Sequence, residues 1–287
     1  MKKWFLSLLV LTTFSFSYGQ SFGIRAGLNY NRFNGPYELG VNEKYSLSNG
    51  FHFGINYAYN FADRFAIKAE LVYTQIGTGY DYDGESFYKV PISANAFFYD
   101  KGNTKINMKI SNAYLTIPLT IQWEVSKKIE VNVGVYAGIL LGPRGSGTLR
   151  YVSYAQPDSL RFRQSLIHNY NNDLAGGAAQ GAIGPAIFTP VGIVELARNA
   201  GAYYNYLDIE KVGTLYNSID FGFTGGISYF INKGFYIGFR YDIGLVDLTN
   251  NEVDVLRKNY DEANNNFIFS KDVDTNIGFQ VSFGFRF

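Results

Sequence analysis

The sequence predicts an all-β fold: an eight-stranded antiparallel up-and-down transmembrane β-barrel with long extracellular loops. Eight segments alternate large apolar residues with small or polar ones, and each approaches or exceeds the roughly 9–11 residues with which a tilted strand crosses a bilayer. The connections between the segments are alternately short and long, as in barrels with one periplasmic and one external side. Aromatic residues make up 18% of the chain, which favours strands.

The first 19 residues predict a signal peptide that is absent from the mature protein. The stretch MKKWFLSLLVLTTFSFSYGQ starts with Lys2 and Lys3, continues with an apolar run over residues 4–11, and places small residues at Ser17 and Gly19. The apolar run is too short to span a bilayer. We therefore expect export, with residues 20–287 forming the barrel domain.

The predicted strands follow one another along the rest of the chain, with ends uncertain by roughly two to four residues. They cover residues 22–32, 50–60, 64–76, 112–125, 129–141, 218–231, 235–247 and 275–287. Tight connections fall at residues 61–63, 126–128 and 232–234, and long ones at 33–49, 77–111, 142–217 and 248–274. Eight strands with this alternation place both chain ends on the short-turn side.

The two faces of the strands indicate a membrane barrel rather than a soluble sandwich. One face is apolar, as in the fifth strand with Ile129, Val131 and Val133. The other face carries many glycines, among them Gly27 and Gly134. A solvated face would favour Thr, Lys or Glu, because glycine weakens an exposed strand. A narrow lumen explains the glycines, so we expect the apolar face to contact outer-membrane lipid.

The same alternation points eight charged residues into the lumen, four of each sign. They are Arg25, Lys68, Glu70, Glu130, Asp220, Arg240, Asp242 and Arg286. Buried charges are costly unless they are paired, which predicts an ion-pair network that fills the lumen. A charged conduction path is the alternative, although an eight-stranded barrel is just wide enough for its own side chains. Pro118 also points inward, where a missing N–H predicts a bulge or widened pairing.

Catalytic chemistry and cofactors find little support in the sequence. Cysteine is absent, so disulfides and thiolate sites are excluded, and the net charge of +1 gives no case for a nucleic-acid partner. His52 is expected to be a polar lumen residue. His168 lies near Ser165 and Asp173 in one loop, but proximity in sequence does not establish a triad. We predict no catalytic residue, no cofactor and no metal.

The long connection over residues 142–217 is the predicted functional segment, since loops of this length are usually functional or disordered. Its first part contains Arg144, Arg150, Arg161 and Arg163, and its middle contains Ile183, Ile187, Phe188, Val191 and Ile193. Two compatible interpretations stay open. The segment forms a self-packed cap over the barrel mouth, or it docks another outer-membrane or surface protein through exposed apolar residues.

The chain ends in NIGFQVSFGFRF, where Phe283, Phe285 and Phe287 lie on the apolar face. Such an aromatic last strand resembles the signal that the barrel assembly machinery reads during insertion. It predicts a location in the bacterial outer membrane.

Several wall segments resemble the PorT-like outer-membrane β-barrel family of Gram-negative bacteria. The matching pieces are AYLTIPLTIQWEVSKKIEVNVGVYAGILLG (113–142), SIDFGFTGGISYFINKGFYIGFRYDIGLVDL (218–248) and the FQVSFGFRF end, with Pro118 and Arg240 at family-typical positions. The named member of that family belongs to the type IX secretion apparatus. The filled lumen and the partly apolar third loop lead us to expect a non-enzymatic accessory subunit of a larger outer-membrane complex, for protein secretion or outer-membrane assembly. The alternatives are a small passive diffusion channel and a lipid-modifying enzyme. The long third loop departs from the family pattern and weakens transfer of any specific role.

Overall fold

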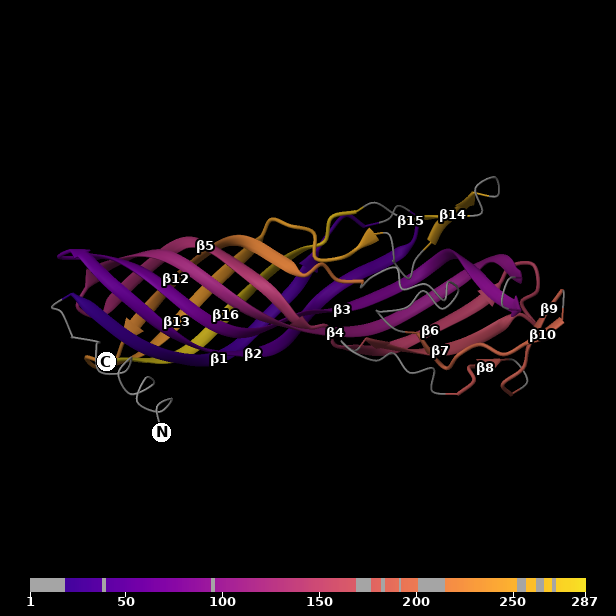
Figure 1. Cartoon of the computed structure of the whole chain (residues 1–287), viewed down its shortest axis with the longest axis horizontal. Coiled ribbons are helices and arrows are strands. Elements are labelled where there is room, and N and C mark those ends of the chain that lie inside the picture. Colours follow the sequence, from indigo (N-terminus) through magenta and orange to yellow (C-terminus); the bar gives the residue numbers. More distant parts are fainter. Residues whose placement is uncertain are drawn as a thin grey trace, which may run out of the picture.

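The computed structural model describes residues 19–37, 40–93, 96–168, 177–181, 184–190, 192–200, 215–251, 257–261, 266–269 and 272–287. Apart from Gly19, the predicted signal peptide lies outside the described residues. No helix within these ranges has the length and apolar character needed to cross a bilayer. The described elements are strands, and Figure 1 shows them in one elongated molecule with a barrel at one end and a curved sheet at the other.

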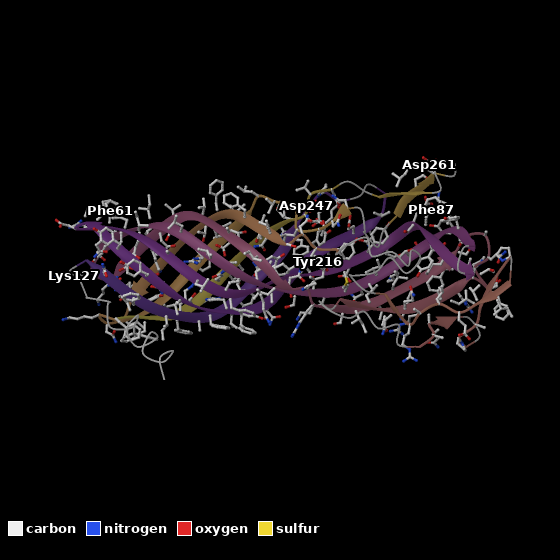
Figure 2. The ribbon with its side chains drawn as sticks, in the orientation of Figure 1. Phe61, Phe87, Lys127, Tyr216, Asp247 and Asp261 are labelled. Atoms are coloured by element: carbon white, nitrogen blue, oxygen red, sulfur yellow. The ribbon has the colours of Figure 1, made fainter. Side chains whose placement is uncertain are left out.

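Eight antiparallel strands form the barrel wall. They are β1 (Gln20–Asn34), β2 (Asn42–Ala62), β3 (Phe65–Ser93), β4 (Ala96–Ser126), β5 (Ile129–Gly142), β12 (Ile219–Phe230), β13 (Phe235–Gly244) and β16 (Thr275–Arg286). Each pairs with the next, and β16 pairs with β1 from Gly23–Arg286 to Asn34–Thr275, so the ring closes. The predicted fold class is confirmed. Phe61 and Lys127, in two tight turns, lie at the same end of the barrel as the C-terminus (Figures 1 and 2).

The wall directs apolar side chains outward and polar ones inward. Phe53, Ile55 and Val133 are 54%, 59% and 62% exposed, as expected for side chains that face lipid. Gly27 faces inward at a close approach: a Cβ there would lie 1.9 Å from the Val281 carbonyl oxygen and 2.8 Å from the His52 ring. Glycine at this position lets neighbouring strands and lumen side chains approach each other.

Three wall strands continue far beyond the barrel, which corrects two of the predicted loops. Residues 77–111 do not form a loop: β3 and β4 run through them as one hairpin, paired almost to its tip. Most of 33–49 is also strand, because β2 begins at Asn42. Alternation continues here as Tyr80 and Tyr82 on β3 and Ile106 and Met108 on β4. On β3, glycine and aspartate occupy the positions beside these apolar residues, which gives the segment the composition of a loop.

The third predicted loop, over residues 142–217, also contains strands in its described ranges. Its strands are β6 (Gly145–Ser153), β7 (Arg161–His168), β8 (Gln180–Gly181), β9 (Ile187–Thr189), β10 (Gly192–Val194) and β11 (Asn199–Ala200). Beyond the barrel, β4 exchanges its partner β5 for β6, β6 pairs with β7, and β7 pairs with β8 and β11. The β9–β10 hairpin lies at the far end of the molecule (Figure 1). A second hairpin joins β14 (Arg257–Asp261) to β15 (Asn266–Phe269). We call the continuation formed by β2, β3, β4, β6 and β7 the external sheet.

Pro118 interrupts a ladder without shifting it. The β3–β4 register runs through Ala69–Leu119 and resumes at Val72–Thr116 with unchanged offset. The predicted bulge is therefore wrong, and the ladder instead lacks the pairs that Glu70 and Leu71 would form with Pro118 and Ile117. The missing N–H of proline removes a bond from the ladder.

Candidate functional site

The centre of the barrel holds one carboxylate surrounded by three cations. Glu70 on β3 lies 3.0 Å from Arg25 Nε on β1 and 3.2 Å from Lys68 Nζ. Arg240 Nη2 on β13 lies 2.5 Å from the same carboxylate. All four side chains are buried, and charges in such a place need close partners to offset the loss of hydration. These contacts connect three wall strands across the lumen.

Asp242, a second buried carboxylate, is connected to this cluster through the neutral side chain of Gln280. Arg25 donates through Nη2 to Gln280 Oε1 (3.0 Å), and Gln280 donates through Nε2 to Asp242 Oδ2 (2.8 Å). Thr224 Oγ1 donates to Asp242 Oδ1 at 2.6 Å. The cavity beside the cluster measures about 10 Å³, about the space of a single water molecule. Side chains therefore fill the lumen at this level.

The other predicted lumen residues lie apart from the cluster. Glu130 and Arg286 form their own ion pair, and the Arg286 guanidinium lies 4.3 Å from the Phe230 ring centroid. Asp220 accepts a hydrogen bond from the Tyr136 hydroxyl at 3.1 Å. Six of the eight predicted residues thus form ion pairs, whereas Asp220 and Asp242 are bound by neutral donors.

His52 is a buried lumen residue fixed on both ring nitrogens. Its Nδ1 lies 2.6 Å from Asn29 Oδ1 and its Nε2 lies 2.9 Å from Ser282 Oγ. The side chain of His168 lies outside the described residues, so its predicted neighbourhood with Ser165 and Asp173 has no structural account. In the described ranges, no group of three or more His, Cys, Asp or Glu side chains is placed to hold a metal ion.

The external sheet has an aromatic core on its inner face, which we did not predict. The rings of Tyr88, Tyr151 and Phe162 all contact one another, with centroids 4.7, 5.2 and 5.4 Å apart. Tyr88 donates its hydroxyl to Gln164 Oε1 and Tyr151 to Asp100 Oδ2, both at 2.6 Å. Burial and the Asp100 carboxylate raise the pKa of Tyr151. Because the hydroxyls are satisfied within the core, the external sheet is a packed structure of its own.

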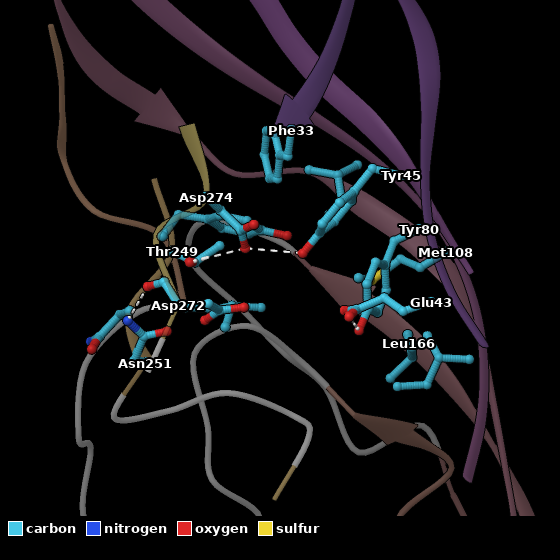
Figure 3. A pocket seen from close by; sticks show the side chains of 15 residues that line it. Phe33, Glu43, Tyr45, Tyr80, Met108, Leu166, Thr249, Asn251, Asp272 and Asp274 are labelled. Atoms are coloured by element: carbon cyan, nitrogen blue, oxygen red, sulfur yellow. Dashed lines mark hydrogen bonds between the residues drawn. The ribbon is translucent and has the colours of Figure 1, made fainter. Parts of the chain in front are cut away.

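A small cavity lies where this core meets the barrel mouth (Figure 3). Its volume is about 50 Å³, enough for a few water molecules. Tyr45 donates to Asp274 Oδ2 at 3.0 Å, and Thr249 donates to the same oxygen at 3.3 Å. Asp274, which follows β15, is thus bonded both to Tyr45 on β2 and to Thr249, which precedes β14. The cavity therefore belongs to the junction that holds the external sheet on the barrel.

The apolar residues predicted as a docking surface divide between core and surface. Ile187 is fully buried and belongs to the core cluster, so it cannot contact a partner. Ile193 is 65% exposed at the far hairpin, and Phe188 is half-buried beside it. Ile183 and Val191 lie outside the described residues.

The four predicted arginines all lie on the surface. Arg144 follows β5 near the barrel mouth, whereas Arg150, Arg161 and Arg163 project from the outer face of β6 and β7. The lysines of the same face are paired: Lys101 with Glu85 at 2.5 Å and Lys105 with Asp83 at 2.9 Å. Hydrogen bonds from Asn103 and Lys105 lower the pKa of Asp83. The arginines lie outside this paired network.

The last strand places its aromatic residues on the lipid-facing side. Phe283, Phe285 and Phe287 are 56%, 41% and 69% exposed. The Phe287 N–H donates to the Phe22 carbonyl at 2.8 Å, which extends the contact between the two ends of the wall by one bond.

A family profile described as "Outer membrane protein beta-barrel domain" matches residues 17–250, most of the chain, and agrees with the closed ring of alternating strands. The chain belongs to this family. Its location is accordingly the bacterial outer membrane. Comparison with curated proteins gives no match.

Solved structures of several outer-membrane proteins are similar to this chain, but at low sequence identity. The attachment invasion locus protein Ail of Yersinia pestis is 11% identical, with 94% of this chain and 100% of that chain covered and a TM-score of 0.36. Neisserial surface protein A is 14% identical, with 93% and 97% covered and a TM-score of 0.33. The Escherichia coli outer membrane protease OmpT is 10% identical, with 96% and 99% covered and a TM-score of 0.33. These values carry no information on function.

Proposed function

We propose that the protein is a non-enzymatic accessory subunit of a larger outer-membrane complex, and that its external part contacts a protein partner. The observation that carries the proposal is the external sheet, which extends the wall strands as a folded platform with its own aromatic core. A platform that is ordered before binding loses little conformational freedom when a partner docks. The resemblance to the PorT-like family favours a role in protein secretion or assembly.

The β9–β10 hairpin is the proposed contact with the partner. Ile193 exposes 65% of its surface at the end of the molecule farthest from the tight turns (Figure 1). Its hairpin neighbours Ile187 and Val194 are buried, which anchors the hairpin to the external core. Exposed apolar residues on a rigid support are typical of interaction sites.

The lumen supports a structural rather than a transport role. The Glu70 cluster and its neutral extension occupy the interior where a conducting barrel would need water. The deciding measurement is conductance of the purified protein in planar bilayers. We expect no reproducible open level, and a steady open level would favour the diffusion channel instead.

The docking proposal is tested by affinity capture of the full chain from its native outer membrane after chemical crosslinking. Ile193→Asp places a charge at the contact and should abolish the crosslinked complex. The matched control is Ile268→Asp on the β14–β15 hairpin, where the isoleucine is 46% exposed. Both variants should retain the barrel. A native mass of the monomer alone, or the same partner in both variants, would contradict the proposal.

A further inference from the structure

Three exposed arginines line one groove on the outer face of the external sheet. Arg150 lies directly opposite Arg163 in the β6–β7 pair, and Arg161 lies two residues before Arg163 on the same face. All three are exposed, and in the described part of the chain none of them forms an ion pair or hydrogen bond. The groove that they share with Gln180 has a volume of about 260 Å³.

A second groove continues the first. It has a volume of about 430 Å³ and shares Arg163 and Gln180 with its neighbour. Arg198 lines it as a fourth exposed arginine. In the second groove, Gln164 is held between the Tyr88 hydroxyl and the Ala197 carbonyl, at 2.6 and 2.7 Å. The arginines therefore stand on a fixed support and extend over more than one binding position.

This arrangement works against the stability of the sheet itself. Like charges directly opposite each other destabilise an antiparallel pair, and Arg150 and Arg163 are in that position. Elsewhere on the same face, Lys105 meets Asp83 and Lys101 meets Glu85. The chain as a whole carries a net charge of only +1, so the arginine grooves are a local concentration of charge. An anionic ligand would relieve the repulsion.

The spacing favours a tetrahedral oxyanion over a single carboxylate. Opposite residues of an antiparallel pair have Cβ atoms about 4.5–5.5 Å apart, and residues two apart on a strand lie about 7 Å apart. Arginine forks bind carboxylates and phosphates by parallel N–H···O bonds. A sulfate or phosphate ester has three terminal oxygens, so it can accept hydrogen bonds from three guanidinium groups at once. A carboxylate has only two oxygens.

The height of the grooves above the membrane weighs against lipid phosphate. The barrel ends near Ser111, where β4 changes partners, and Arg150 lies opposite Lys105, six residues farther along. That separation corresponds to about 15–20 Å of height for tilted strands. At physiological salt, the Debye length is about 8 Å. Attraction to headgroup phosphates is therefore screened at the grooves.

We propose that the arginine grooves bind an anionic glycan through its sulfate or phosphate ester groups. Two adjoining grooves with a shared arginine suit an extended chain whose charged groups repeat. This inference goes beyond the proposed function and does not require a protein partner, because it concerns the face of β6 and β7 and not the β9–β10 hairpin.

The test measures binding of fluorescein-labelled dextran sulfate and dextran phosphate to the full chain in detergent by fluorescence anisotropy. The two probes distinguish the sulfate and phosphate forms of the ligand, and neutral dextran gives the baseline. The variant R150Q/R161Q/R163Q should weaken binding by at least about tenfold, since each exposed ion pair contributes modestly. The control K101Q/K109Q removes two charges from the same face, at positions that are not opposite the arginines, and should change binding by less than about threefold.

Two further arms decide between occupants. Polyglutamate tests an acidic protein, and vesicles with anionic lipid test the membrane surface. Tighter binding of either than of both dextran esters would overturn the proposal, as would equal loss in the arginine and lysine variants. Arg163→Gln alone, in the residue that both grooves share, provides the test if the triple variant does not fold. Unchanged binding in that variant would also overturn it.

Discussion

Removing the Glu70 carboxylate should leave three cations buried inside the barrel without the carboxylate with which each of them forms its ion pair. The substitution Glu70→Gln keeps the shape of the side chain and deletes its charge. Arg25, Lys68 and Arg240 then face one another, and Asp242 is in contact with Thr224 and Gln280 rather than with them. We expect this variant to be the most destabilising single change in the lumen.

The expected magnitude follows from the distances. At an effective dielectric constant of about 20, a contact at 2.5–3.2 Å corresponds to about 5–7 kcal/mol of Coulomb attraction. Desolvation and repulsion among the cations offset most of that. Breaking a buried pair by removing one partner typically costs about 3–5 kcal/mol. We therefore expect Glu70→Gln to lower the free energy of unfolding by about this amount.

The assay is a urea titration of the mature chain folding into phospholipid vesicles. Trp123 reports on insertion because it is 45% exposed on the lipid-facing side. The control is Glu130→Gln: its partner Arg286 has a side chain 29% exposed and keeps its contact with the Phe230 ring. That variant should cost about 1 kcal/mol or less. The double variant Lys68→Met/Glu70→Gln should recover part of the loss because one unpaired cation is gone.

A loss below about 1 kcal/mol for Glu70→Gln would refute the reasoning, since it would place the cluster in a well-hydrated lumen. A loss equal to that of Glu130→Gln would have the same meaning. Conductance recordings on the same variant would then show whether water reaches the cluster.

Three further predictions concern the wall, the external core and the last strand. Gly27→Ala should lower the free energy of unfolding of the barrel by about 3 kcal/mol or more, because the new Cβ would lie 1.9 Å from the Val281 carbonyl oxygen. Gly225→Ala is the control: its nearest atom is 3.8 Å away, so it should be nearly neutral in the same urea titration. Tyr151→Phe leaves Asp100 without its hydrogen bond and should cost the external sheet about 1–3 kcal/mol, measured by hydrogen exchange. Because the pKa of Tyr151 is raised in the folded state, its contribution to the stability of the external sheet is complete below the unfolded pKa of about 10 and is lost as the pH rises above that value. If Tyr151→Phe showed the same loss of hydrogen-exchange protection at alkaline pH, this explanation would be contradicted. Deleting Phe287 removes one backbone bond to Phe22 and should slow insertion in cells while changing the free energy of unfolding by about 1 kcal/mol or less; normal insertion rates would exclude a signalling role.

The wall of the barrel could be predicted because its physics is local. Alternation at period two assigns each residue to lipid or lumen, and the short turns at Asp63 and Lys127 fix which strands are neighbours. Predicted and observed wall strands agree closely at the turn side. They differ at the external ends of β2, β3 and β4, which run on past the mouth.

The sequence predicts which charged residues point into the lumen, but not which of them form ion pairs with one another. Alternation placed both Glu70 and Asp220 inside, yet only Glu70 meets cations. Which charges lie at the same height depends on the stagger between strands that are far apart in sequence, such as β1, β3 and β13. That stagger is a property of the closed ring, and no single segment encodes it.

The external sheet was missed because its strands look like turns. The stretch around Asp81, Asp83 and Gly84 has the composition of a loop, but its aspartates pair with Lys105 and Asn107 on β4. The partner exchange of β4 at the mouth also depends on distant residues, since β6 takes the place of β5 only after the chain bends between Gly142 and Gly145.

Because β3 and β4 pass from the wall into the external sheet as continuous strands, the elevation of every external residue is set by strand length. Each added pair of residues in the two strands would raise the arginine grooves and the far hairpin by about 5–7 Å and keep the same faces outward. A single added residue would instead move the external side chains of β3 and β4 to the opposite face, so that Lys105, opposite Arg150, would point toward the aromatic core. A change of reach that keeps the outer face of these strands therefore comes in steps of two residues.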